Sequence, residues 1–269
     1  MGPFISTCDG NELFHLDWGS GRPVVFVHAW ALSSEFFRHQ LSDLTDQGFR
    51  CVAYDRRGHG RSSTPGFGYD YDTLADDLDA VLRALDLHDV TLVAHSMGGG
   101  DALRYVSRHG TRQISRAVFI APAAPCMVRR NDNPDGLPRE VVDASLALFR
   151  SDFPRWVREQ SRAFFAPETS DATVEWGIDM MMRTPLRTVV ECARTMADED
   201  LRPDLARLDV PALFVHGDRD ASIPFAFGEA AARLAPRARF RPYLGAPHGL
   251  PVTHAGALVR DIVHFIAET

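Results

Sequence analysis

A serine that follows a short apolar strand carries the clearest chemical signal in this sequence. Residues 90–94 are expected to form a strand, His95 and Ser96 come next, and glycines at 98–100 lead into a helix. Small residues around a serine at a strand-to-helix turn are typical of a nucleophile elbow, which exposes the serine hydroxyl. Because that hydroxyl is a weak nucleophile at neutral pH, the site also needs a general base and donors for an oxyanion.

The base and the acid that orients it are expected in two loops that follow later strands. His248 lies in a loop flanked by proline and glycine, where a turn can present an imidazole at the edge of a sheet. Asp220 is the preferred acid and Asp218 the alternative, because both follow the strand at 211–216. The aspartate that is not the acid is expected to be a turn or cap residue. The chain order Ser96, Asp220, His248 is one of three known for serine triads.

Ten further histidines are present, and most are expected to be structural. His28, His95 and His216 lie at strand ends near the expected site, so we expect them to orient their neighbours by hydrogen bonds. The others are expected at the surface or in packing contacts.

Two backbone N–H groups are the expected oxyanion donors. Met97 directly follows the serine at the start of a helix, and Trp30 lies in the loop after the strand at 23–28. The Trp30 indole could also form a wall of the pocket, and the alternative reading of Trp30 is an ordinary core aromatic. Apolar side chains are expected to line the substrate pocket, with simple packing as the alternative for each, namely Ala31, Met127, Phe164, Phe165, Met196 and Ile223.

Alternating strands and helices must position these residues. They predict a mostly parallel sheet of about eight strands with helices on both faces. The expected strands are 4–7, 12–17, 23–28, 50–55, 90–94, 116–121, 211–216 and 239–244, and the expected helices are 35–46, 72–86, 101–108, 225–234 and 254–267.

One long segment interrupts this alternation. Residues 122–208 show no convincing strand, and helices are expected at 138–150, 153–165, 171–182 and 186–197. We therefore expect a core made of residues 1–121 and 209–269, with residues 122–208 inserted as a helical cap over the sheet.

Composition excludes several kinds of function. The 269 residues carry a net charge of −7, which disfavours nucleic acid as a partner. All 29 basic residues are arginine, so a Schiff-base lysine and a phosphate-loop lysine are both excluded. The four cysteines are scattered without a C-x-x-C pair, which indicates free thiols and no metal site. No apolar run approaches the length of a membrane span, and no secretion signal is evident, so we expect a cytoplasmic protein without a cofactor.

Together these segments resemble the α/β-hydrolase superfamily over nearly the whole chain. Within it, the chain is similar to the cofactor-free haloperoxidase, arylesterase and γ-lactamase group. The segments that carry the resemblance are 26–30 (FVHAW), 54–62 (YDRRGHGRS), 95–100 (HSMGGG), 216–220 (HGDRD) and 246–249 (APHG). The resemblance implies that Ser96 is the nucleophile, His248 the base and Asp220 the orienting acid, with Met97 and Trp30 as backbone oxyanion donors.

The resemblance also implies an activity. The expected function is hydrolysis of small carboxylic esters or lactones through an acyl-enzyme, with perhydrolase or haloperoxidase activity as a side reaction. Three positions depart from the usual pattern: Ala94 and Ala29 replace glycines, and Ala31 stands where some peroxide-using relatives have proline. Lactam, amide or carbon–carbon bond hydrolysis on the same triad is one alternative, and a non-catalytic ligand receptor on this fold is another. The sequence leaves a homo-oligomer open.

Overall fold

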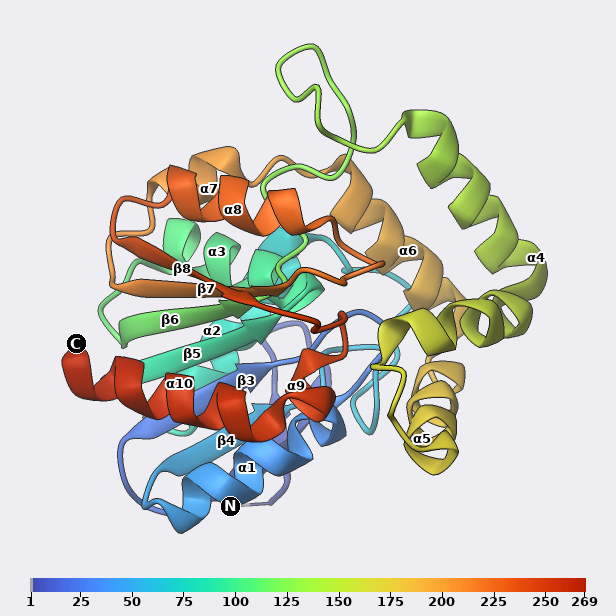
Figure 1. Cartoon of the computed structure of the whole chain (residues 1–269). Coiled ribbons are helices and arrows are strands. Elements are labelled where there is room, and N and C mark those ends of the chain that lie inside the picture. The colour runs from blue at the N-terminus through green and yellow to red at the C-terminus, as the bar shows by residue number, and fades with distance from the viewer. Residues whose placement is uncertain (1) are drawn as a thin grey trace.

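The computed structural model describes residues 2–269, and its centre is a single sheet of eight strands (Figure 1). Their order across the sheet is β1-β2-β4-β3-β5-β6-β7-β8. Among the strand pairs of the described residues, only those of β2 with β1 and β4 are antiparallel, so the predicted mostly parallel sheet is confirmed. The strands are β1 (Phe4–Ser6), β2 (Glu12–Trp18), β3 (Pro23–Val27), β4 (Arg50–Tyr54), β5 (Val90–His95), β6 (Ile114–Ile120), β7 (Ala212–Gly217) and β8 (Ala238–Tyr243).

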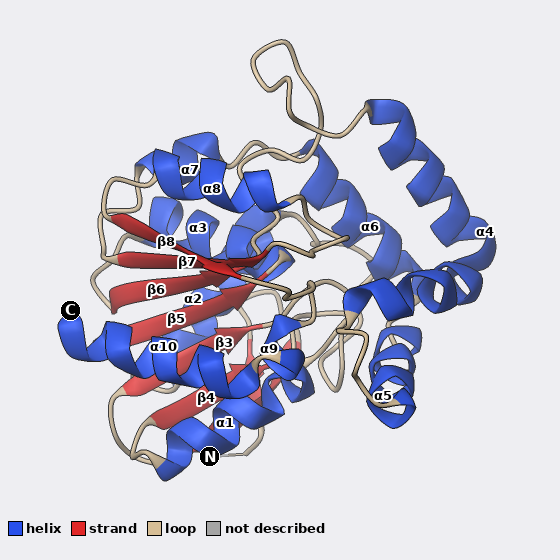
Figure 2. Cartoon of the chain, viewed as in Figure 1, coloured by secondary structure: helices blue, strands red, loops and turns tan. Residues whose placement is uncertain are grey.

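Helices cover both faces of this sheet (Figure 2). The first face packs against α2 (Tyr71–Ala84), α3 (Met97–His109), α7 (Arg202–Ala206) and α8 (Phe225–Leu234). The opposite face packs against α1 (Arg38–Asp46), α9 (Leu250–Thr253) and α10 (Ala255–Glu268). Because both faces are covered, the central strands are mostly apolar, and every residue of β5 is buried.

The region predicted as one helix at 35–46 has two parts. A 3₁₀ turn, η1 (Ser34–Phe37), comes first and α1 follows it. Ser33 caps the turn with its side chain, which accepts a hydrogen bond from the Glu35 backbone. A serine at this position offers an acceptor to the free N–H groups at a helix start, which explains the early onset of the turn.

The segment between β6 and β7 is helical, as its sequence predicts. It contains α4 (Arg139–Phe164), α5 (Asp171–Met182) and α6 (Leu186–Asp198), and residues 122–208 hold isolated bridges but no strand. α4 is interrupted at Asp152, where φ is −158°, shortly before Pro154. This break agrees with the two separate helices predicted at 138–150 and 153–165, because proline disfavours a helical conformation ahead of it.

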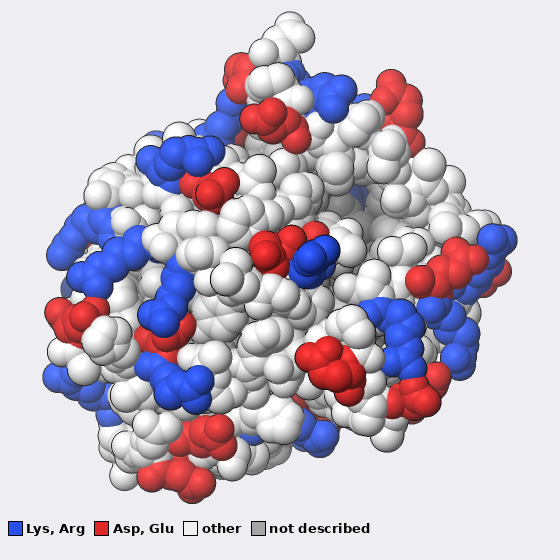
Figure 3. Space-filling model, viewed as in Figure 1, with Lys and Arg blue, Asp and Glu red and all other residues white. Residues whose placement is uncertain are grey.

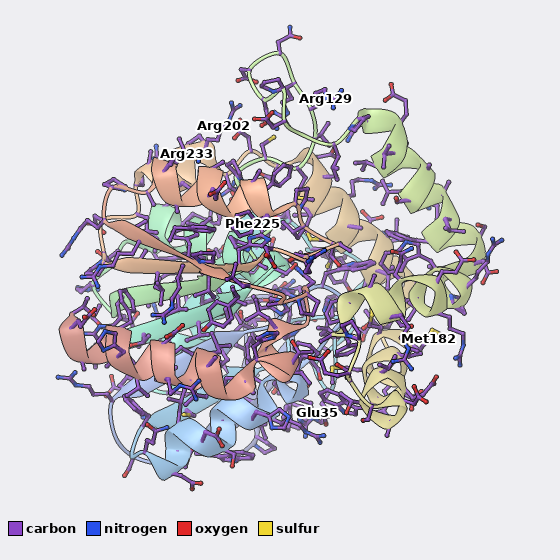
Figure 4. The ribbon with its side chains drawn as sticks, viewed as in Figure 1. Glu35, Arg129, Met182, Arg202, Phe225 and Arg233 are labelled. Atoms are coloured by element: carbon purple, nitrogen blue, oxygen red, sulfur yellow. The ribbon has the colours of Figure 1, made fainter. Side chains whose placement is uncertain are left out.

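Part of the inserted segment lies away from the sheet, and its last helix returns to the helices that cover the sheet. In Figure 1, α4 and α5 stand away from the sheet, whereas α7 lies beside α8. A loop near Arg129 projects from the top, and Arg202, labelled close to it in Figure 4, pairs with Asp132 of that loop and with Asp200. These ion pairs join the two ends of the segment. Within residues 2–269, the structure has no helix with the length and hydrophobicity needed to span a membrane.

Candidate active site

Ser96 occupies a strained turn between β5 and α3. Its φ and ψ are 55° and −117°, a region that costs a residue other than glycine about 1–3 kcal/mol. The turn is held on both sides, since the Ser96 N–H donates to the Ile120 carbonyl and the Ser96 carbonyl accepts from Ala123. The surrounding backbone therefore fixes the strained conformation of a residue whose side chain lines a cavity.

The three glycines after Met97 allow the helix to approach the sheet closely. A Cβ on Gly98 would lie 2.4 Å from the Val27 carbonyl oxygen, and one on Gly100 would lie 2.1 Å from the Tyr71 ring. A Cβ does not fit at these distances, so Gly98 lets α3 begin directly beside β3 and Gly100 lets it pack against α2. This close approach brings the N-terminus of α3 next to the loop that follows β3.

Asp220 and His248 are joined directly. The Nδ1 atom of His248 lies 2.6 Å from Oδ2 of Asp220, and both side chains are almost completely buried. The other carboxylate oxygen, Oδ1, accepts hydrogen bonds of 2.8 Å from the backbone N–H groups of Ser222 and Ile223. Burial acts to raise the pKa of Asp220, but His248, His216 and these donors outweigh it and hold the pKa well below its ordinary value. Asp220 is therefore ionised at neutral pH.

Asp218 has a different position. It is exposed, and its Oδ1 accepts a 2.7 Å hydrogen bond from the Gly245 backbone N–H. That contact ties the loop after β7 to the loop after β8, which is the turn-residue behaviour expected of the aspartate that does not orient the base. Of the two sequence candidates, Asp220 is the one that contacts His248.

His95 connects the nucleophile candidate to the base candidate. Its Nε2 lies 3.1 Å from the His248 carbonyl oxygen, and the two rings are 4.8 Å apart. Burial lowers the pKa of His95 well below its ordinary value, so the imidazole is neutral. Ser96 and His248 both line one cavity, and no hydrogen bond joins their side chains among residues 2–269. Contacts between nucleophile and base are often looser in ligand-free sites and tighten when substrate binds.

The two expected oxyanion donors lie on segments that meet at Ser96. Met97 is the first residue of α3, where backbone N–H groups have no acceptor within the helix. Trp30 lies in the loop after β3, and its backbone N–H has no hydrogen-bond acceptor among residues 2–269. Its indole is held separately, since Nε1 donates to the Val189 carbonyl of α6 at 2.9 Å. The indole also lines the cavity, as the sequence suggested for this side chain.

A buried arginine braces the loop that carries Trp30. The guanidinium of Arg56 donates to the His28 carbonyl at 2.7 Å and pairs with Asp101 of α3 at 2.7 Å, and all three side chains are buried. The Arg56 backbone N–H donates to Nε2 of His28 at 2.9 Å. Because Asp101 belongs to the helix that starts after Ser96, the ion pair connects the loop after β3 to that helix.

A cavity of 670 Å³ opens above Ser96, between the sheet and the inserted helices. Figure 3 shows a hollow there whose rim is largely free of charged side chains. Among residues 2–269, Asp220 and His248 are the only residues with titratable side chains that line it, and none of the 29 arginines does. The cavity therefore suits uncharged, apolar ligands.

Most of the predicted pocket residues line this cavity. They are Met127, Phe164, Phe165, Met196 and Ile223. Ala31 does not, which differs from the expectation: it is fully buried, and its N–H donates to Nε2 of His59 at 3.2 Å. Ala31 has a positive φ of 57°, and its neighbours Trp30 and Leu32 line the cavity although Ala31 does not.

One wall of the cavity was missed by the sequence reasoning. α4 contributes many lining residues, including Val142, Leu146, Phe149, Trp156 and Val157. Val142, Leu146 and Phe149 are spaced by four and three residues, which places them on one face of the first part of α4, before the break at Asp152. The same spacing is typical of a helix that packs against an ordinary hydrophobic core, so it does not by itself predict a cavity wall.

Comparisons with known proteins point to one family. Residues 22–255 match a family described as the alpha/beta hydrolase fold. A non-heme chloroperoxidase from Kitasatospora aureofaciens is 40% identical over 272 residues, which cover 98% of this chain and 99% of that protein. An esterase from Exiguobacterium antarcticum superposes with a TM-score of 0.96 at 32% identity, covering 99% of this chain and 100% of that one. A bromoperoxidase from Bacillus anthracis has a TM-score of 0.94 at 32% identity, covering 98% and 99%.

Proposed function

The chain belongs to the α/β-hydrolase family, and from that premise we propose that it is a serine hydrolase of small, uncharged carboxylic esters or lactones. The observation that carries the proposal is the Asp220–His248 pair at the edge of the largely apolar cavity that Ser96 lines. In this proposal, residues 1–121 and 209–269 form the catalytic core, and residues 122–208 form a cap that closes the cavity.

The proposed cycle is an acyl transfer in two halves. His248 takes the proton of Ser96 as the hydroxyl attacks the substrate carbonyl, while the Met97 and Trp30 N–H groups hold the oxyanion. The imidazolium then protonates the leaving alcohol, and water, activated by His248, releases the acid from the acyl-enzyme. Asp220 keeps the Nδ1 side of His248 in place and stabilises its positive charge in both halves.

The lining of the cavity supports the substrate class. An anionic substrate would enter a cavity that holds the ionised Asp220 behind His248 and that no arginine of residues 2–269 lines, so its charge would not be balanced. An apolar acyl or aryl group, in contrast, meets Trp30, Phe164 and the apolar face of α4, where its burial contributes about 25 cal/mol per Å².

Hydrogen peroxide can replace water in the second half of the cycle. Its attack on the acyl-enzyme releases a peracid and regenerates Ser96, and the peracid can then oxidise a halide ion in solution. We propose this perhydrolysis as a side activity, with support from the non-heme chloroperoxidase and bromoperoxidase that resemble the chain. The alanine at position 31 leaves the loop after β3 without the proline of some peroxide-using relatives.

A panel of nitrophenyl esters, lactones and lactams, each with water alone and with added peroxide, tests the proposal. We expect turnover of uncharged esters or lactones and none of dianionic esters. Hydrolysis of lactams or diketones in place of esters would favour amide or carbon–carbon chemistry on the same residues. Absence of turnover together with saturable binding of an apolar ligand would instead favour a receptor.

A further inference from the structure

Asp220 contacts a second imidazole, which the proposed cycle does not use. His216, near the end of β7, is fully buried, and its Nε2 lies 3.3 Å from Oδ2 of Asp220, the same oxygen that meets His248. The same Nε2 lies 3.1 Å from the Ile223 carbonyl oxygen. Because a carbonyl oxygen only accepts hydrogen bonds, Nε2 carries the hydrogen; this N–H donates to the Ile223 carbonyl and also lies beside Oδ2 of Asp220.

The other side of the His216 ring is held by packing. Its Nδ1 is buried and has no hydrogen-bond partner among residues 2–269. A Cβ added to Gly228 of α8 would lie 2.3 Å from that Nδ1. Phe225, labelled in Figure 4 at the start of α8, packs edge-on against the ring at 5.8 Å. The imidazole therefore packs between α8 and Asp220, which restricts its position.

We propose that His216 is a positioning residue that fixes the Asp220 carboxylate for His248. Two backbone N–H groups hold Oδ1, and His216 places a rigid N–H 3.3 Å from Oδ2, so the carboxylate is restrained from both ends. The donor also draws negative charge from Oδ2, which weakens the attraction between Asp220 and the protonated His248. The inference rests on the proposed function.

The surroundings of His216 restrict how it can act. It does not line the cavity, so it affects substrate only through Asp220. The titratable side chains around it are Asp220 from the loop after β7, His248 from the loop after β8, and His95 from the end of β5. His95 bonds the His248 backbone and is therefore a separate support.

Two substitutions of His216 test whether its N–H donor or only its side-chain volume matters for activity. His216→Leu removes the Nε2–H, and we expect kcat to fall about tenfold at unchanged KM, with the acidic limb of the kcat profile moving up by about half a pH unit. His216→Gln keeps an N–H donor and should restore both values to within about twofold. His88→Gln, an exposed histidine, is the matched control.

Gly228→Ala provides a second variant in case His216→Leu folds poorly. The new methyl group displaces the His216 ring without removing its donor, and we again expect lower kcat at unchanged KM. Gly256→Ala is its control, because a Cβ there meets nothing closer than 3.6 Å. An unchanged kcat and pH profile in His216→Leu overturns the proposal, and so does His216→Gln behaving like the leucine variant.

An NMR titration of the His248 ring gives a readout that does not depend on turnover. We expect the midpoint of the His248 titration to move to higher pH in His216→Leu and to match the wild type in His216→Gln. An unchanged midpoint in His216→Leu would contradict the positioning role of His216. A wild-type protein without esterase activity, in contrast, counts against the proposed function alone.

Discussion

Nε2 of His95 lies 3.1 Å from the carbonyl oxygen of His248. The residue before the proposed nucleophile thus holds the backbone of the proposed base, although 153 positions separate them. Together with the bond from His248 to Asp220, this contact makes the loop after β8 part of the same rigid unit as the turn at Ser96.

The two aspartates after β7 form a natural pair for mutagenesis. Asp220→Asn leaves the shape of the site intact but removes the negative charge beside His248, so we expect kcat for a nitrophenyl ester to fall by about 10³–10⁴-fold. Asp218→Asn keeps an acceptor for the Gly245 N–H and should change kcat less than about threefold. Equal losses in the two variants would contradict the assignment of Asp220.

The Gly249 backbone links the inserted helices to the base. Its N–H donates to the Phe164 carbonyl at the end of α4, and the Phe164 ring meets the His248 ring edge-on at 5.4 Å. A Cβ on Gly249 would lie 2.6 Å from that carbonyl oxygen, so Gly249→Ala must displace Phe164. We expect a loss of about 1–3 kcal/mol in unfolding free energy and a fall in kcat of about tenfold. Wild-type kcat in this variant, measured against Gly256→Ala, would show that α4 does not position His248.

The depth of the cavity predicts how acyl length affects turnover. Ala193 on α6 lines the cavity, and Ala193→Phe adds an aromatic ring to that space. We expect kcat/KM for a long-chain nitrophenyl ester to fall at least about tenfold, and that for the acetate ester to stay within about twofold. Leu186→Phe, at an exposed position on the same helix, is the control. Uniform loss for both esters would place the acyl group elsewhere.

Much of the fold and the proposed triad could be predicted from the sequence because their signals are local. The apolar run of β5 and the glycines after Ser96 specify a strand, a turn and a closely packed helix within a few residues. Asp220 and His248 each lie in the loop that follows a strand, which places them at one edge of a parallel sheet. The mostly parallel order was predicted correctly for the same reason.

Other features depend on contacts between distant segments. The Trp30 indole donates a hydrogen bond to the Val189 carbonyl, and the position of the His216 ring depends on the absence of a side chain at Gly228. No local sequence pattern predicts either contact. Ala31 was expected to line the pocket, but it is fully buried and its N–H donates to His59, which lies 28 positions away in the sequence. The cavity face of α4 has the periodicity of an ordinary packed helix, so only the three-dimensional arrangement shows that it borders open space.

Buried neutral histidines predict sensitivity to acid. Burial lowers the pKa of His59 to about 3, and its Nε2 accepts the Ala31 N–H only when unprotonated. The unfolded chain binds a proton near pH 6.5 and the folded chain does not until near pH 3, so stability falls as pH decreases between these values. His59 should contribute about 1.4 kcal/mol per pH unit to that slope.

Urea unfolding at several pH values between about 4 and 5.5 measures this slope. His59→Gln should reduce it by the share of one histidine, whereas His88→Gln, at an exposed position, should leave it unchanged. Parallel slopes for the wild type and His59→Gln would contradict the neutral state of His59.

Labelling with a fluorophosphonate, followed by peptide mass spectrometry, tests the central claim most directly. We predict one adduct per chain on the peptide that contains Ser96, with esterase activity lost in proportion to labelling. Ser96→Ala should take up no label, keep the unfolding temperature of the wild type and lack measurable turnover. Full esterase activity in Ser96→Ala, or an adduct on another residue, would contradict the account.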